Sequence, residues 1–208
     1  MRPFMERLDP SLIGMEAYAS SQSWAREPSQ LRPEVRLIPP SYVKPFVKRG
    51  KSDAVDAEAI CEAVTRPNMR FVEPKSPEQQ ATLSLHRARA LIVRQKTQVI
   101  NMVRGLLAEF GIVVPVGVSR IMALAKNWPN DLAHSLPETA QEVVANLFHQ
   151  LVALERRVGW YSQKIASHVH KDAQAKRLLA IPGIGPITAS AIVATVGNAR
   201  QFGNGREL

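Results

Sequence analysis

The sequence predicts an α/β amino-terminal portion followed by a helical remainder. Short strand-like runs alternate with helical segments at the start of the chain, in the order 12–17, 23–31, 34–38 and 53–65. Beyond a Ser-Pro-Glu helix start at 76–78, the stretch to Phe110 contains no Gly or Pro except Gly105, which is typical of one long helix. The fold class is therefore α/β plus α.

The two predicted strands belong to a parallel or mixed sheet, because strands that alternate with helices usually form one. The second strand, 34–38, is stopped by the Pro-Pro pair at 39–40. Two strands do not make a stable sheet by themselves. The sequence therefore predicts that part of this sheet is missing at the amino end.

Three carboxylates are candidate metal ligands. Asp53 and Asp56 open a helix three residues apart and share one face of it, and Glu16 interrupts the apolar run of the first strand. Such hard oxygen ligands suit Mg²⁺ or Mn²⁺, and a pair of these ions can act on a phosphodiester. Taken alone, the two aspartates are explained better as a helix cap and a first-turn acid.

The basic residues around the aspartates favour the metal interpretation. Lys48, Arg49 and Lys51 precede the helix and are placed to hold a phosphate backbone. The whole chain of 208 residues has 27 Lys and Arg against 18 Asp and Glu, a formal charge of +9. A polyanionic partner is expected, with nucleic acid ahead of an anionic membrane surface.

Targeting signals are not evident in the sequence. No stretch approaches the ~18 apolar residues of a spanning helix, and the first residues lack the apolar region of a signal peptide. The single cysteine, Cys61, excludes a disulfide within the chain and is expected in the core. We expect a cytoplasmic protein without a membrane partner.

The helical middle carries heptad patterns in two segments. Leucine, isoleucine and valine recur every seven residues in the first, at Leu85, Ile92, Val99 and Leu106, with Ala88, Gln95 and Met102 between them. The second repeats at Val144, Leu147, Leu151, Leu154, Val158, Tyr161 and Ile165. These seams predict a coiled coil, formed either between the two helices or with a second chain in a homo-oligomer.

One charge sign dominates the first of these helices. No acidic residue occurs from 79 to 108, whereas basic residues stand at Arg87, Arg89, Arg94, Lys96 and Arg104. Such a face repels itself unless an anion lies on it. A solvated surface that aids solubility is the alternative, and the net charge of the chain favours nucleic-acid contact.

The segment 178–193 has the pattern of a helix-hairpin-helix: a helix, a Pro-Gly-x-Gly turn and a second helix. Gly183 and Gly185 allow unusual backbone conformations and a close approach to phosphate. The second helix presents its positive end to the same anion. The alternative is a helical hairpin without a ligand.

Taken together, these residues resemble bacterial insertion-sequence transposases of the IS110 kind over nearly the whole chain. The resemblance rests on segments 12–17 (LIGMEA), 35–40 (VRLIPP), 42–46 (YVKPF), 51–59 (KSDAVDAEA), 106–112 (LLAEFGI), 181–185 (IPGIG) and 205–208 (GREL).

The resemblance implies a DNA recombinase with an amino-terminal RuvC-like domain of RNase H fold. Family members use an Asp-Glu-Asp-Asp tetrad with Mg²⁺ and a serine in a carboxyl-terminal transposase domain, and a structured guide RNA directs target choice. Glu16, Asp53 and Asp56 match the second, third and fourth members, and so are the catalytic and metal-binding candidates. No residue in 1–10 matches the first aspartate, and Ser190 does not match the serine.

We therefore expect a partial RuvC-like domain at 1–75, a coiled-coil region at 76–170 and the start of a helix-hairpin-helix transposase domain at 171–208. The resemblance predicts truncation at both ends, and a chain that cannot exchange DNA strands by itself. Its expected activity is nucleic-acid binding through the two glycines and four cations, which are Arg87, Arg89, Arg94 and Lys96.

Two other functions are compatible with the sequence. The chain could be a non-catalytic or regulatory subunit that assembles with full-length transposase through its heptads. The acidic residues alone would also fit a structure-specific nuclease, although this activity needs a fourth ligand that the sequence does not provide.

Overall fold

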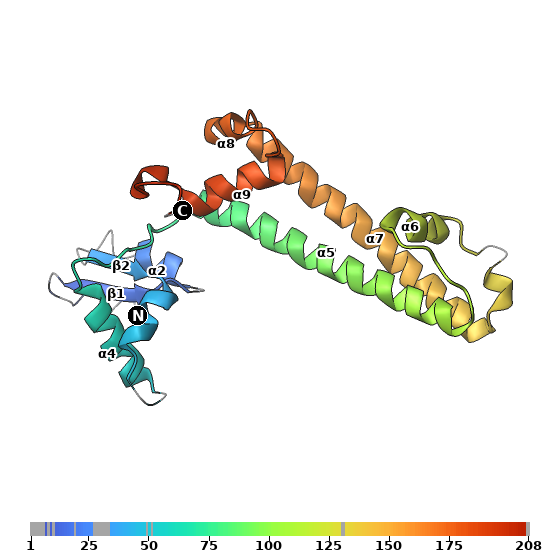
Figure 1. The fold of residues 1–208 in the computed structure, drawn as a ribbon, viewed down its shortest axis with the longest axis horizontal. Helices are drawn as coiled ribbons and strands as arrows, with labels where there is room; N and C mark the ends of the chain where they lie inside the picture. Colours follow the sequence, from blue (N-terminus) through green and yellow to red (C-terminus); the bar gives the residue numbers. More distant parts are fainter. Residues whose placement is uncertain are drawn as a thin grey trace. The chain divides into compact units, whose positions relative to one another are not determined.

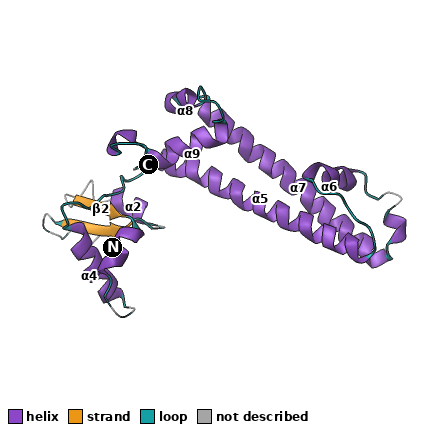
Figure 2. Ribbon diagram, in the orientation of Figure 1, coloured by secondary structure: helices purple, strands orange, loops and turns teal. Residues whose placement is uncertain are grey.

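The computed structural model describes residues 7, 9, 11–18, 20–26, 34–48, 50, 52–129 and 132–206. The chain divides into two compact units, residues 1–76 and residues 77–208. The first contains a small sheet with helices, and the second is helical (Figure 2). The predicted division into an α/β and an α portion agrees with this architecture.

The first unit is built around two parallel strands (Figure 1). Its elements are β1 (Leu12–Glu16), α2 (Ser21–Arg26), β2 (Glu34–Ile38), α3 (Pro40–Val43), the 3-10 turn η2 (Lys44–Phe46) and α4 (Asp53–Val64). Leu12 lies opposite Glu34, and Glu16 lies opposite Ile38. Val72 adds an antiparallel bridge, because its N–H donates to the Leu37 carbonyl at 2.7 Å.

Helix α4 covers the sheet through small and branched side chains. Ala59, Ala63 and Val64 are buried with Ile38 and Val43. These side chains form the hydrophobic core of the first unit.

The closest approach of α4 to the sheet is at Gly14. A Cβ atom at this position would stand 2.9 Å from Ile60 Cγ2 and 3.0 Å from Val64 Cβ. Cys61 faces away from this contact and is exposed, so the expectation that it packs in the core is wrong. Its neighbours at 60, 63 and 64 occupy the face that meets the sheet.

The second unit is dominated by two helices of 33 and 32 residues. Its elements are α5 (Pro77–Glu109), α6 (Val118–Lys126), the 3-10 turn η3 (Ala133–Ser135), α7 (Glu138–Val169), α8 (Ala173–Leu178), α9 (Pro186–Val196) and the 3-10 turn η4 (Ala199–Gln201). Pro77 and Glu78 begin α5, where a missing N–H costs nothing and an acid is favoured by the helix dipole.

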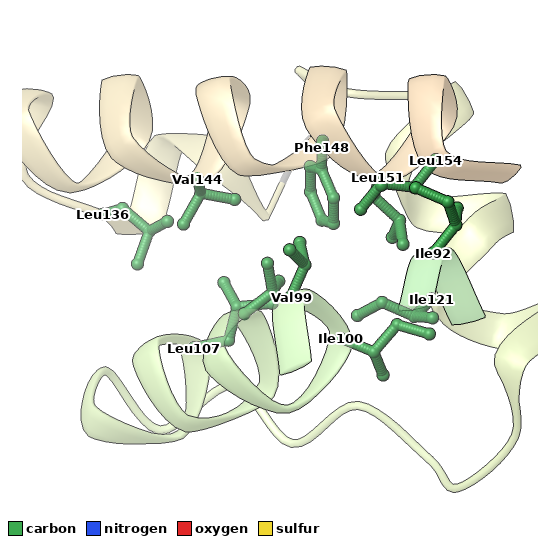
Figure 3. Packing of buried hydrophobic residues seen from close by; sticks show 11 residues of the cluster. Ile92, Val99, Ile100, Leu107, Ile121, Leu136, Val144, Phe148, Leu151 and Leu154 are labelled. Carbon is green, nitrogen blue, oxygen red and sulfur yellow. The ribbon is translucent and has the colours of Figure 1, made fainter. Parts of the chain in front are cut away.

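Helices α5 and α7 lie side by side and run antiparallel (Figure 1). Arg89 contacts Ser162, and Lys96, further along α5, contacts Glu155, which comes earlier in α7. The two helices therefore run in opposite directions. The buried core between them contains Ile92, Val99, Ile100, Val103, Leu107, Val144, Phe148, Leu151 and Leu154. Phe148 points toward Val99 in this core (Figure 3).

The buried stripe of α5 departs from the predicted heptad seam. Met102, a predicted seam residue, is 53% exposed, whereas Val103 and Leu107 are fully buried. A straight helix has 3.6 residues per turn, so a strict seven-residue repeat drifts away from the contact. Ile92 and Val99 of the predicted α5 seam pack with Val144, Leu151 and Leu154 of α7 within one chain.

Helix α6 was not predicted from the sequence. Gly117 provides no side-chain cap at its start, and a nine-residue helix is marginal alone. Ile121 stabilises it by inserting into the α5–α7 core (Figure 3). The Arg104 guanidinium donates to the carbonyls of Pro115 and Gly117 and so anchors the preceding loop.

The carboxyl-terminal helices α8 and α9 pack together on the end of α7. Asp172 caps α8, because its Oδ1 accepts from the N–H groups of Gln174 and Ala175 at 2.7 and 3.0 Å. Val169, Ala175 and Ala189 form their buried contact. None of the helices in the described ranges combines the length and apolarity needed to span a membrane.

Candidate nucleic-acid interface and carboxylate positions

The two candidate aspartates stand in the first turn of α4, and both are exposed. The cap of this helix is Ser52, whose Oγ accepts from the Val55 N–H at 3.4 Å. Asp53 is therefore the first helical residue, not the cap that the sequence indicated. Both negative charges are stabilised by the positive, amino-terminal end of the helix dipole.

Glu16 comes from β1, whereas the two aspartates come from α4. It is half-buried at the end of β1, two residues beyond Gly14, and Gly14 meets the carboxyl-terminal half of α4 at Ile60 and Val64. At 1.5 Å per residue, the first turn of α4 lies roughly 6–16 Å along the helix from that contact.

The donor chemistry of these carboxylates suits Mg²⁺. No group of three or more His, Cys, Asp or Glu side chains in the described part of the chain is arranged to hold a metal ion. We therefore assign no metal-dependent step to Glu16, Asp53 and Asp56 in this arrangement.

The basic residues before α4 are only partly described. Lys48 forms an ion pair with Glu58 on α4, and both side chains are well exposed. Arg49 and Lys51 lie outside the described residues. A pair of exposed charges is weak and exchanges readily with a competing phosphate.

Three of the five cations on α5 have partners inside the chain. Arg89 Nε donates to Ser162 Oγ at 2.9 Å, and Lys96 Nζ donates to Glu155 Oε2 at 2.7 Å. Arg104 holds the loop before α6. These residues bind the helices together, and the self-repulsion inferred from the sequence is reduced by their contacts.

The other two cations on α5 face solvent. Arg87 and Arg94 are both exposed and lie roughly half a turn around the helix from the buried Ile92–Val99 seam. Seven residues separate them, so they stand on one face about 10 Å apart along the axis. We call this pair the α5 outer face.

The turn between α8 and α9 contains both predicted glycines. Gly183 has φ +86°, a conformation that favours glycine. Gly185 has φ −89° and ψ 174°, which any residue adopts, and a Cβ there would meet nothing within 4 Å. The predicted conformational reason for the second glycine therefore does not apply.

The start of α9 presents free backbone donors beside this turn. No side chain in the described residues caps it, and Pro186 at its first position has no N–H. The next N–H groups, of Ile187 and Thr188, have no partner within the helix. The exposed Lys176 and Arg177 lie at the end of α8 just before the turn. Together these groups form a concentration of positive potential, which we call the glycine turn site.

Sequence reasoning assigned no role to the histidines, yet His86 contacts Ser190. His86 Nε2 on α5 lies 3.0 Å from Ser190 Oγ on α9, and Ser190 is only 5% exposed. Burial, followed by the nearby Arg89 guanidinium, lowers the pKa of His86 below 6.5. Ser190 also lines a pocket of about 360 Å³ together with residues that include Glu78, His168 and Asp172.

A second cationic surface on α7 was also missed by sequence reasoning. It consists of Arg156, Arg157, Trp160 and Lys164, all exposed, and we call it the Trp160 surface. The signal that could have found it is the spacing of Arg156, Trp160 and Lys164, four residues apart on one helical face.

Two family models match the chain. Residues 5–112 match a model of IS110-type DEDD transposases, described as "Transposase". Residues 175–208 match the model described as "Transposase IS116/IS110/IS902 family". The first match covers about half of the chain and includes all three candidate carboxylates, and the second includes the glycine turn site.

Similar proteins of known sequence are named as transposases. The chain is 48% identical to "Probable family 20 transposase" of Pseudomonas aeruginosa, over 100% of the chain and 62% of that protein. It is 38% identical to the transposase for insertion sequence element IS1328 of Yersinia enterocolitica, over 99% of the chain and 60% of that protein. It is 34% identical to the transposase for insertion sequence element IS1111A of Coxiella burnetii, over 94% of the chain and 54% of that protein. The chain thus spans less than two thirds of the length of each.

Proposed function

Because the chain belongs to the IS110 family of insertion-sequence transposases, we propose that residues 1–208 provide a nucleic-acid-binding part of the machinery for DNA transposition. The resemblance assigns 1–75 to a partial RuvC-like domain, 76–170 to a helical coiled-coil region and 171–208 to the start of the transposase domain. The formal charge of +9 supports DNA as the partner.

The first contact that we assign to DNA is the α5 outer face. Arg87 and Arg94 are exposed, whereas Arg89 and Lys96 on the same helix are occupied with Ser162 and Glu155. An arginine that faces solvent can bind phosphate without breaking a contact of the fold. Arg87 and Arg94 are therefore the residues that we assign to phosphate binding. Arg89 and Lys96 hold α5 against α7.

The second contact is the glycine turn site. Free N–H groups at a helix start bind phosphate oxygens, and the helix dipole adds to this attraction. The extended backbone at Gly185, with open space where a Cβ would stand, carries this part of the proposal. Nothing in the folded chain requires glycine there, whereas a phosphate against the backbone would.

Substitution of Gly185 by alanine tests the glycine turn site. We expect Gly185→Ala to lower the urea midpoint of unfolding only slightly, because Gly185 is the N-cap of α9, and to weaken duplex DNA binding several-fold in fluorescence anisotropy. Gly105→Ala is the matched control, because it also meets open space but lies in the middle of α5. Equal DNA affinity of Gly185→Ala and the unsubstituted chain would refute the site.

Binding without cleavage is the expected behaviour of these residues alone. The family implies divalent-metal chemistry, but the described residues contain no group of three or more His, Cys, Asp or Glu side chains arranged to hold a metal ion. We expect no Mg²⁺- or Mn²⁺-dependent cleavage of element-end DNA by residues 1–208. Turnover that Asp53→Ala abolishes would show that the carboxylates come together in solution.

The regulatory-subunit function and guide-RNA binding remain proposals with less support. Assembly through free heptads was the physical basis for a subunit that joins a full-length transposase. The α5 and α7 seams are buried against each other in one chain, so such a subunit would need another surface. The nucleic-acid-binding function needs no such addition.

A further inference from the structure

The Trp160 surface lies on the side of α7 that faces away from α5. Trp160 stands nine residues after the buried Leu151, about two and a half helical turns, and therefore points opposite to the core. The indole is 50% exposed. Trp160 is not part of the core between α5 and α7. Its exposure is unusual, because burial of the large indole stabilises a protein strongly.

Cations surround this tryptophan on its own helix. The Lys164 Nζ lies 5.6 Å from the centre of the indole ring, and Arg156 and Arg157 line a shallow hollow of about 370 Å³ with Trp160 and Tyr161. Tyr161 meets the indole edge-on, with ring centres 4.9 Å apart. Tyr161 and Lys164 thus cover part of the indole, and half of the Trp160 side chain remains exposed.

No carboxylate neutralises this surface along α7. Glu155 is the only acidic residue between 143 and 171, and it is paired with Lys96 toward α5. Three cations thus remain around a half-exposed aromatic ring. A surface of this kind is complementary to a ligand that combines negative charge with flat apolar rings.

From this geometry we infer that the Trp160 surface binds a single-stranded segment of nucleic acid, with an unpaired base stacked on the indole and phosphates held by Arg156, Arg157 and Lys164. Unpaired bases expose their faces, whereas a duplex hides them within the stack. An apolar protein partner fits less well, because three exposed cations would be desolvated against it. The inference rests on the proposed nucleic-acid function but concerns a different helix face and unpaired bases.

The test compares single-stranded and duplex binding in matched variants. Labelled oligothymidylate, oligouridylate and duplex DNA are titrated with the chain, with Trp160→Leu and with Trp160→Phe, and anisotropy is recorded. Leucine keeps an apolar side chain but cannot stack, and phenylalanine can. We expect Trp160→Leu to bind at least one single strand roughly 5- to 100-fold more weakly, and Trp160→Phe to stay within about threefold.

The cations are tested by salt dependence. Replacing both arginines, Arg156→Gln with Arg157→Gln, should reduce the slope of log affinity against log salt for a single strand by about 1.4, or about 0.7 per lost phosphate contact. Tighter binding of oligouridylate or of oligothymidylate supports the inference equally and shows which of the two strands the surface prefers.

Failure of this inference is distinguishable from failure of the proposed function. If Trp160→Leu binds both single strands as tightly as the unsubstituted chain, while Gly185→Ala still weakens duplex binding, the Trp160 surface is not a nucleic-acid site and the proposed function stands. If leucine and phenylalanine weaken binding equally, stacking is refuted. If neither duplex nor single strand is bound at all, both are wrong.

Discussion

His86 on α5 and Ser190 on α9 share a hydrogen bond of 3.0 Å between Nε2 and Oγ. The two residues are 104 positions apart in sequence, and the bond joins the start of the long helical pair to the last long helix of the chain. The glycine turn site lies at the start of α9. Its orientation relative to the α5 outer face therefore depends on this contact.

Loss of the serine hydroxyl should loosen this junction. Ser190 is almost fully buried, so Ser190→Ala removes one hydrogen bond without opening a large cavity and should lower the free energy of unfolding by about 1 kcal/mol. Ser167→Ala on α7 is the control, because Ser167 is exposed and bonds only its own helix. Urea unfolding of both variants measures the difference, and equal stabilities would contradict the role of the bond.

The same contact should make stability depend on pH. The lowered pKa of His86 means that the unfolded chain takes up a proton more readily than the folded chain. The stability contributed by neutral His86 is therefore complete above about pH 6.5 and is lost as the pH falls through the lowered folded-state pKa. We expect urea midpoints measured across this range to fall more steeply for the unsubstituted chain than for His86→Gln. Parallel curves would show that His86 does not carry the effect.

The sequence could predict those helices and strands whose apolar residues recur at a regular spacing. Strand β2 begins and ends where expected, and α5 and α7 follow from their apolar repeats. Helix α6 was missed because its stability comes from Ile121 inserting into a core built by distant segments. Periodicity detects a helix that has its own long apolar stripe, but not one that a neighbour stabilises.

The candidate site was harder to predict because it depends on which way each side chain points in the folded chain. Arg87 and Arg89 look alike in sequence, yet one faces solvent and the other bonds Ser162. The three carboxylates share a chemistry but come from a strand and a helix, and the described residues contain no group of three such side chains arranged to hold a metal ion. The Trp160 surface escaped notice because Trp160 and its cations lie outside the heptad seam.

Cations on opposite sides of α5 should respond differently to neutralisation. Lys96 is 14% exposed and bonds Glu155 at 2.7 Å, whereas Arg94 is exposed. Lys96→Met should lower the free energy of unfolding by about 1 kcal/mol through loss of a charged hydrogen bond, and Arg94→Met by less than about 0.5 kcal/mol. Thermal or urea unfolding measures both. A larger loss in Arg94→Met would overturn the assignment of inner and outer faces.

Two glycines should respond to alanine with opposite signs. A Cβ at Gly14 would clash with Ile60 and Val64, so Gly14→Ala should destabilise the first unit by about 1–3 kcal/mol. Gly105 lies within α5 with open space around it, and Gly105→Ala should stabilise the second unit by about 0.5–1 kcal/mol. Hydrogen exchange of each unit reports the two effects separately. A neutral Gly14→Ala would mean that α4 does not pack on β1 as described.

The central claim, that the solvent-facing cations of this chain bind DNA, is tested most directly by salt-dependent DNA binding of a charge-reversed chain. Duplex DNA is titrated at several salt concentrations with the unsubstituted chain and with Arg87→Glu combined with Arg94→Glu. We predict weaker binding and a slope of log affinity against log salt reduced by about 1.8, because two phosphate contacts are lost. An unchanged affinity and slope would contradict the claim and remove the α5 outer face from the interface.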